Sequence, residues 1–105
     1  MAELGIDIAE GTVLAGYRVE RVLGRGATGT VYLARDEALD RHVALKLLAP
    51  DLARDPRFRE RFLRESRIAA GLEHPGIVPI YAAGETEGTL FLAMRYVRGD
   101  LRAAI

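Results

Sequence analysis

Three glycines stand close together near the start of the chain, Gly24, Gly26 and Gly29, and Val31 follows them. Glycine has no Cβ atom, so its backbone can approach a phosphate closely and offer N–H groups to it. The same spacing occurs in dinucleotide-binding loops that lead from a strand into a helix, and in ordinary glycine-rich hairpin turns. Here β-branched and aromatic residues follow, Thr30-Val-Tyr-Leu33, which favours a phosphate-covering loop between two strands.

Lys46 is the second residue whose type calls for a reason. The 15 basic residues of the chain are 14 arginines and this one lysine. It follows Val43-Ala-Leu in an apolar stretch that reads as a strand, where alternate residues share a face. A compact ammonium on a slim stem can reach between two phosphates, and a planar guanidinium replaces it poorly. The alternative is a structural lysine whose charged end reaches water from an edge strand.

Glu65 is the third. The segment from Asp55-Pro56 to Ala70 predicts a helix with Asp55 as N-cap and Gly71 as its stop. Glu65 falls on the apolar stripe of that helix, where an unpaired carboxylate would be costly to bury. Lys46 is its expected partner; pairing with Arg61 or another nearby arginine is the alternative. The members of the stripe are Phe58, Phe62, Ala69 and Leu72.

The elements that must position these residues follow from the distribution of β-forming and helix-forming segments. The order strand, strand, strand, helix, strand, strand predicts an α+β fold, a five-stranded antiparallel sheet with one packed helix. A further short strand is expected near Thr12–Leu14. The five expected strands are Tyr17–Leu23, Thr30–Arg35, His42–Leu48, Ile77–Ala83 and Leu90–Val97.

The three motifs in this order resemble the N-terminal lobe of protein kinases, over about residues 16–105. His74-Pro-Gly-Ile-Val78 resembles the junction after the family's helix, and Met94-Arg-Tyr-Val97 resembles its hinge. The stretch Glu60–Glu65 is similar to that of bacterial serine/threonine kinases. The resemblance divides the chain into a lead-in (1–16), the lobe (17–97) and the start of the first helix of a second lobe (98–105).

The resemblance also implies roles, residue by residue. Lys46 and Glu65 would form the ion pair that positions the phosphates of ATP, and the loop from Gly24 through Ala27 and Thr28 to Gly29 would cover them. Arg95 and Val97 would bind adenine through their backbones. Asp100 would meet the ribose, although the chain is one residue short after Gly99. The adenine pocket would be walled by Leu23, Val31, Ala44 and Val78, with Met94 behind it.

The implied activity is transfer of the γ-phosphate of ATP to serine or threonine hydroxyls of a protein substrate. The catalytic His-Arg-Asp and the Asp-Phe-Gly that holds Mg²⁺ have no counterpart in these 105 residues. We therefore expect the chain alone to be inactive, with the magnesium ligands supplied by a second lobe. A non-catalytic kinase-like interaction module is the alternative. A Rossmann-type oxidoreductase domain is disfavoured by the strand after Gly29.

Composition narrows the remaining classes. The formal net charge is zero, which argues against a nucleic-acid-binding module. The chain has no cysteine and only two histidines, so a zinc site is not expected. No signal peptide or membrane-spanning run is visible, which predicts a cytoplasmic location, with a membrane anchor on a C-terminal part left open. A homodimer through this lobe is expected if the apolar last strand, Leu90 to Met94, is exposed.

Overall fold

The computed structural model describes residues 8–71 and 79–97. The expectations for Leu72, for the junction 74–78 with Val78, and for Asp100 and the helix start at 98–105 fall outside these residues.

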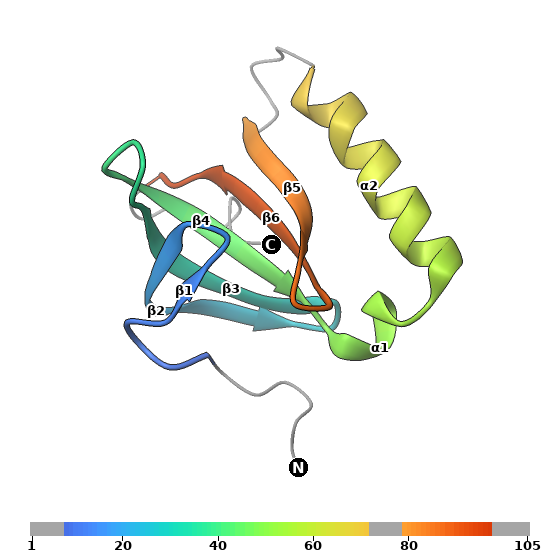
Figure 1. Ribbon diagram of the computed structural model, residues 1–105, viewed down its shortest axis with the longest axis horizontal. Helices are drawn as coiled ribbons and strands as arrows, with labels where there is room; N and C mark the ends of the chain where they lie inside the picture. The colour runs from blue at the N-terminus through green and yellow to red at the C-terminus, as the bar shows by residue number, and fades with distance from the viewer. Residues whose placement is uncertain (1–7, 72–78, 98–105) are drawn as a thin grey trace.

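An antiparallel sheet forms the body of the chain (Figure 1). It has six strands in the order β1-β2-β3-β4-β6-β5, one more than the five expected. The additional strand β1 is the short one foreseen within the lead-in, which pairs with the start of β2, so part of the lead-in belongs to the sheet. The strands are β1 (Val13–Leu14), β2 (Tyr17–Gly26), β3 (Gly29–Asp36), β4 (Arg41–Leu48), β5 (Ile80–Thr86) and β6 (Thr89–Arg95).

The register sorts the side chains of the sheet onto two faces. Lys46 of β4 pairs with Val31 of β3 and with Leu92 of β6, and side chains of directly opposed residues share a face. Their neighbours Tyr32 and Leu47 therefore point to the other face, because successive strand residues alternate. We call the two faces the Lys46 face and the Tyr32 face.

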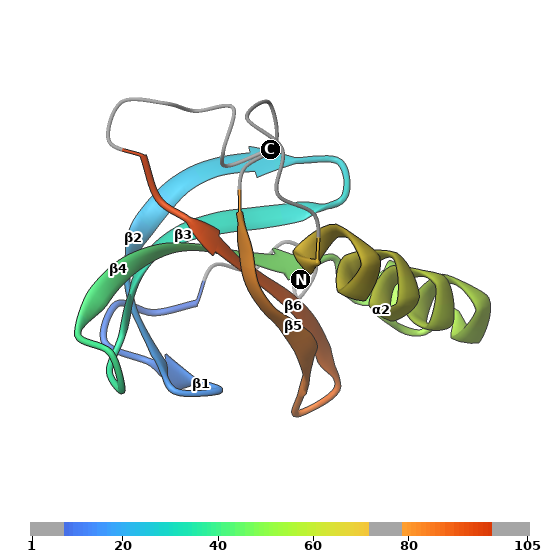
Figure 2. The ribbon, with the colours of Figure 1, turned by 90° about the horizontal axis from the view of Figure 1, so that it is seen from above.

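The Tyr32 face carries the larger apolar core. Tyr32 and Leu45 are almost completely buried, at 1% exposure each, and the strong curl of the sheet brings distant strands over them (Figure 2). Tyr17 and Phe91 meet there with ring centroids 6.1 Å apart. This core is built from Tyr17, Val19, Tyr32, Ala34, Val43, Leu45, Leu47, Phe91 and Ala93.

Two helices follow β4. The short helix α1 (Pro50–Ala53) was not predicted, because the sequence places a proline there that reads as a strand end. Helix α2 (Pro56–Ala70) begins as expected: the Asp55 carboxylate accepts hydrogen bonds from the N–H groups of Arg57 and Phe58, at 3.0 and 3.5 Å. Gly71 is its C-cap. Seen from above, α2 lies alongside β5 at the edge of the sheet (Figure 2).

The last strand differs from expectation. Leu90, Phe91 and Met94 are buried, each at 8% exposure or less, because both faces of β6 are covered by apolar clusters of this chain. The exposed apolar patch that would have favoured self-association is therefore not present on this strand. Among the described residues, no helix is long and apolar enough to span a bilayer.

Candidate functional site

The glycine loop is a hairpin between β2 and β3, as the residues after Gly29 predicted. Gly26 pairs with Gly29 across the turn, and Ala27 and Thr28 are exposed at its tip. The Thr28 carbonyl accepts a hydrogen bond from the Ala49 N–H at 2.9 Å, which ties the tip to the end of β4. A strand follows the loop here, which excludes the geometry of a dinucleotide-binding loop and is shared by phosphate-covering and ordinary glycine-rich hairpins.

Glycine suits the three positions for different local reasons. A Cβ atom on Gly24 would meet no atom within 4 Å, and one on Gly26 would meet only the Gly29 carbonyl oxygen at 3.9 Å. A Cβ on Gly29 would lie 2.2 Å from the Leu47 carbonyl oxygen, far inside contact distance. Gly29 therefore lets the hairpin pack on β4, whereas Gly24 and Gly26 leave open space beside the backbone that a phosphate can approach.

An apolar cluster on the Lys46 face lies next to the loop. Val31, Ala44 and Met94 are buried in it and Leu23 packs against them, so four of the five residues expected around adenine come together; Val78 is outside the described residues. The sequence did not single out three further members that complete the cluster. They are Ile80, Leu92 and Tyr96.

Lys46 lies between this cluster and a second one on the same face. Ala44, two residues before it, belongs to the first cluster, and Leu48, two residues after it, packs with Leu90 under α2. The lysine is half-buried, and burial lowers the pKa of its ammonium below the ordinary 10.5. A partly desolvated ammonium interacts strongly with an anion, because fewer waters screen the pair.

Glu65 is not where the helical stripe predicted it. Its side chain is exposed, and Ser66 is buried in its place at 7%. Among the ion pairs of residues 8–71 and 79–97, none joins Lys46 to Glu65. In this arrangement of the helix the two side chains do not pair, and their pairing in an ATP-bound state stays a prediction.

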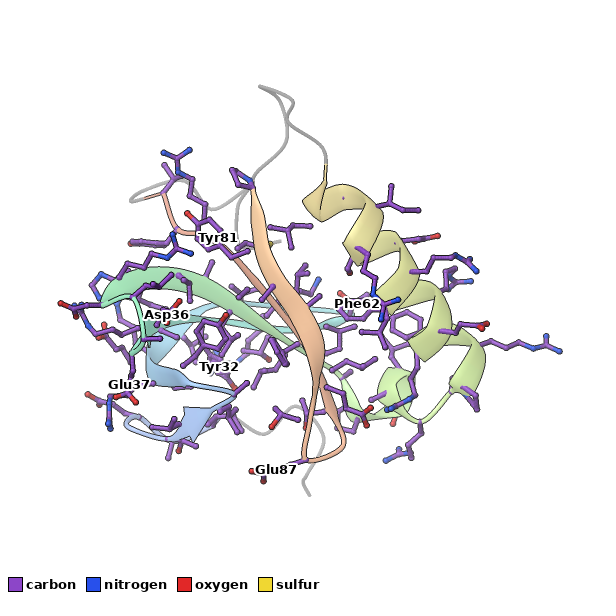
Figure 3. All side chains as sticks on the ribbon, turned by 45° about the horizontal axis from the view of Figure 1, so that its top comes forward. Tyr32, Asp36, Glu37, Phe62, Tyr81 and Glu87 are labelled. Carbon is purple, nitrogen blue, oxygen red and sulfur yellow. The ribbon has the colours of Figure 1, made fainter. Side chains whose placement is uncertain are left out.

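The rotation of α2 explains this position. Phe58, Phe62 and Leu63 pack on Leu48 and Leu90, and Figure 3 shows Phe62 on the side of α2 that faces the sheet. Because Leu63 joins the two phenylalanines, the centre of the buried face moves away from Glu65 and onto Ser66. The stripe read from the sequence had omitted Leu63, and that omission placed Glu65 inward.

An ion pair fixes the same rotation. Arg59 pairs with Glu85 of β5, and its guanidinium also donates to the Ala53 carbonyl at 3.0 Å. These contacts connect α2 to β5 and to α1. Sequence reasoning missed them, because the partners are 26 residues apart and each alone looks like an ordinary surface charge.

The hinge, Met94–Val97, begins in the last two residues of β6. The Arg95 N–H donates to the Pro79 carbonyl at 3.0 Å, and Arg95 also pairs with Val43 of β4. Val97 is exposed at 39%. Beside the hinge, the rings of Tyr96 and His42 meet edge to face at 6.3 Å. The backbone contacts to adenine expected from Arg95 and Val97 stay a prediction.

Three features of this face are of the kinds that suit a nucleotide: an apolar cluster, open glycine backbone beside it and one partly desolvated ammonium. A metal ion would need a different set of donor side chains from those of this face. Residues 8–71 and 79–97 contain no group of three or more histidine, aspartate or glutamate side chains able to hold one, so this part of the chain offers Mg²⁺ no ready-made site.

Comparison with known proteins identifies the family to which the sequence is similar. The protein kinase domain pattern matches residues 17–105. The serine/threonine-protein kinase PknJ of Mycobacterium tuberculosis is 54% identical over 103 residues, covering 93% of this chain and 18% of that protein. PknE of the same organism is 46% identical over 97 residues, covering 91% of this chain and 17% of that protein. The chain thus spans less than a fifth of the length of these relatives.

Solved structures agree with the fold. The crystal structure of the Mycobacterium tuberculosis PknI kinase domain superposes with a TM-score of 0.80 at 44% identity, covering 88% of this chain and 38% of that one. A second structure, PpkA-294 in its apo form, superposes with a TM-score of 0.68 at 26% identity, covering 86% of this chain and 38% of that one.

Proposed function

The chain belongs to the protein kinase domain family, and from that premise we propose that it is the ATP-binding lobe of a serine/threonine kinase. In a protein that also supplies the catalytic base and metal ligands, it would hold ATP while the γ-phosphate passes to a serine or threonine hydroxyl of a protein substrate. Mg²⁺ would come with those ligands. The single observation that supports this most is that the apolar cluster, Lys46 and the open glycine backbone lie together on neighbouring strands of one sheet face.

The residues would divide the work by chemistry. The apolar cluster around Val31, Ala44 and Met94 would cover the adenine ring, and the hinge backbone would supply its hydrogen bonds. Gly24 and Gly26 would admit phosphate oxygens to the backbone N–H groups. The ammonium of Lys46 would balance the negative charge of the ATP phosphates, of which the γ-phosphate is the group transferred. These contacts position ATP, and positioning is a large part of catalysis in phosphoryl transfer.

Glu65 would act only after a change in α2. One residue of helix corresponds to about 100° of rotation, so a turn of roughly this size exchanges Ser66 for Glu65 on the buried side. We propose that such a turn brings Glu65 to Lys46 in the ATP-binding state. The Arg59–Glu85 ion pair opposes that turn and would have to break or slide.

ATP binding can be titrated by calorimetry with wild type, Lys46→Met and Lys46→Arg. We expect both variants to bind at least about tenfold more weakly, since a charge-assisted phosphate contact contributes about 1.5–3 kcal/mol. Arg64→Met removes an exposed arginine of α2 and serves as the matched control, with unchanged affinity. Equal binding by wild type and Lys46→Met would contradict the phosphate role of Lys46.

The non-catalytic interaction module remains the second candidate, and activity separates the two. The 105-residue chain alone should transfer no phosphoryl group to a protein. The kinase that carries this lobe should transfer it, and should lose the activity with Lys46→Met. An active Lys46→Met kinase would favour the module.

Partners and location follow from the proposed chemistry. ATP and a protein substrate are the expected partners, and a cytoplasmic location is proposed because ATP is the substrate. A homodimer through this lobe has little support, since the strand expected to be exposed is buried.

A further inference from the structure

A pocket of about 490 Å³ opens on the Tyr32 face, opposite the proposed nucleotide site. Tyr32 and Leu47 line it, and they alternate with Val31 and Lys46 along the same strands. Its volume lies within the range typical of small-molecule sites. The remaining lining residues are Ile8, Leu14, Gly26, Ala27, Gly29, Thr30, Leu48, Ala49, Pro50, Thr86, Glu87 and Thr89.

The chemistry of the lining selects the class of ligand. Apolar side chains and backbone make most of the wall, and the threonines add hydroxyl groups at 30, 86 and 89. Among the described residues of the lining, Glu87 is the only charged one, and none is a lysine or an arginine. It lies at the tip of the β5–β6 turn, with Tyr32 inside the curl of the sheet (Figure 3). The described part of the lining offers no counter-charge to a phosphate or carboxylate, whereas it matches an apolar body with one positive charge.

The glycine loop forms one wall of the same pocket. Gly26, Ala27 and Gly29 contribute to the lining, and the tip is held to Ala49, another lining residue, through the Thr28 carbonyl. A molecule in the pocket would therefore touch the back of the loop whose other side faces Lys46. Occupancy would stabilise one loop position and favour or oppose a ligand on the Lys46 face.

We propose that this pocket binds a small apolar molecule carrying one amine, and that its occupancy is sensed by the glycine loop. The apolar body lies over Tyr32 and Leu47, and the ammonium is read by Glu87 at the rim. The site differs from the nucleotide site in face, in charge and in ligand class.

The test uses 1-naphthylmethylamine as probe, 1-naphthoate as the anionic molecule of the same ring, and backbone amide NMR of the chain. We expect shifts at Thr30, Leu47 and Thr89 and in the loop, and about fivefold tighter binding of the amine than of the anion, the size of an exposed ion pair. Glu87→Gln should abolish that preference. Glu60→Gln, an exposed carboxylate of α2, should keep it.

A filling variant tests the cavity itself. Thr89→Phe should weaken the amine at least about tenfold by occupying its space, and Thr86→Phe serves the same purpose if Thr89→Phe does not fold. Shifts centred elsewhere, equal binding of both probes to wild type, or unchanged binding by a folded filling variant would overturn the proposal.

Coupling to nucleotide is a separate arm, which rests on the proposed function. Saturating amine should change the affinity for ATP at least about threefold, and ATP should change the affinity for the amine by the same factor. If the chain binds no ATP, the proposed function fails while the NMR test of the pocket still stands. Binding of both ligands with no mutual effect would overturn the role of the loop as sensor.

Discussion

Lys46 combines a half-buried position with a charge, and this makes stability depend on pH. Burial lowers its pKa in the folded chain below the ordinary 10.5, so the folded state loses the proton at lower pH than the unfolded state. Between the two pKa values the unfolded chain binds more protons, and stability therefore rises with pH there. Below the folded pKa both states are charged, and the folded state carries the full desolvation penalty.

This predicts a pH-dependent difference between wild type and Lys46→Met. The contribution of position 46 should favour the variant at neutral pH, and the difference should shrink as pH rises toward 10.5, because the penalty on wild type disappears. Urea unfolding of both proteins at several pH values measures it. A difference that grows in favour of the variant over this window would show that burial does not lower the pKa of Lys46.

Substitution by alanine should lower stability at Gly29 and weaken ATP binding at Gly24. Gly29→Ala places a Cβ 2.2 Å from the Leu47 carbonyl oxygen, so we expect a loss of about 2 kcal/mol or more in unfolding free energy. Gly24→Ala meets nothing within 4 Å and should change stability little, while weakening ATP binding by crowding the phosphate path. Thermal unfolding and ATP titration of the two variants separate packing from binding, and similar stabilities would contradict the assignment.

At the scale of elements, α2 is defined by its first turn. Asp55 caps two of its N–H groups, and such caps contribute about 1 kcal/mol. Asp55→Ala should therefore lower the unfolding free energy by about that amount. Asp51→Ala is the matched control: it removes an exposed ion pair to Arg54, expected to be worth less than about 0.5 kcal/mol. Equal effects of the two changes in chemical denaturation would contradict the cap.

The side of α2 that meets the sheet is decided by two kinds of contact. Phe58, Phe62 and Leu63 pack on the end of the Lys46 face, and Arg59 holds the helix to Glu85. Both place Ser66 inward. Under the proposed function, the rotation of α2 would decide whether Glu65 reaches Lys46, and the sheet would keep its arrangement.

At the scale of the whole molecule, stability depends on the core of the Tyr32 face. Leu45 is 1% exposed in that core, and a buried leucine truncated to alanine typically costs about 2–5 kcal/mol. A domain of this size has a total of only about 5–15 kcal/mol. Leu45→Ala should therefore remove a large part of the free energy of unfolding. Leu39 is 62% exposed, so Leu39→Ala should leave the free energy of unfolding unchanged. Denaturant unfolding with equal midpoints for both would contradict this.

Much of the candidate site could be predicted from the sequence, because its signals are local. The strand after Gly29, the lysine among apolar residues and the Asp55-Pro56 helix start each depend on neighbours in the chain. Alternation along β4 was enough to predict that Ala44, Lys46 and Leu48 share a face. The strand order and the sixth strand were less accessible, since pairing between distant strands is not a local property.

By itself, the sequence determined which residues are candidates for the proposed chemistry: the glycine loop, Lys46 and the apolar residues that meet beside it. Only the tertiary structure decided that Glu65 is exposed and Ser66 buried, that Gly29 serves packing, and that a pocket lies behind the loop. The reason is physical. Periodicity gives a helix its apolar side to within about one residue, or 100°, and the contacts from Leu63 and from the Arg59–Glu85 pair fix the remaining angle.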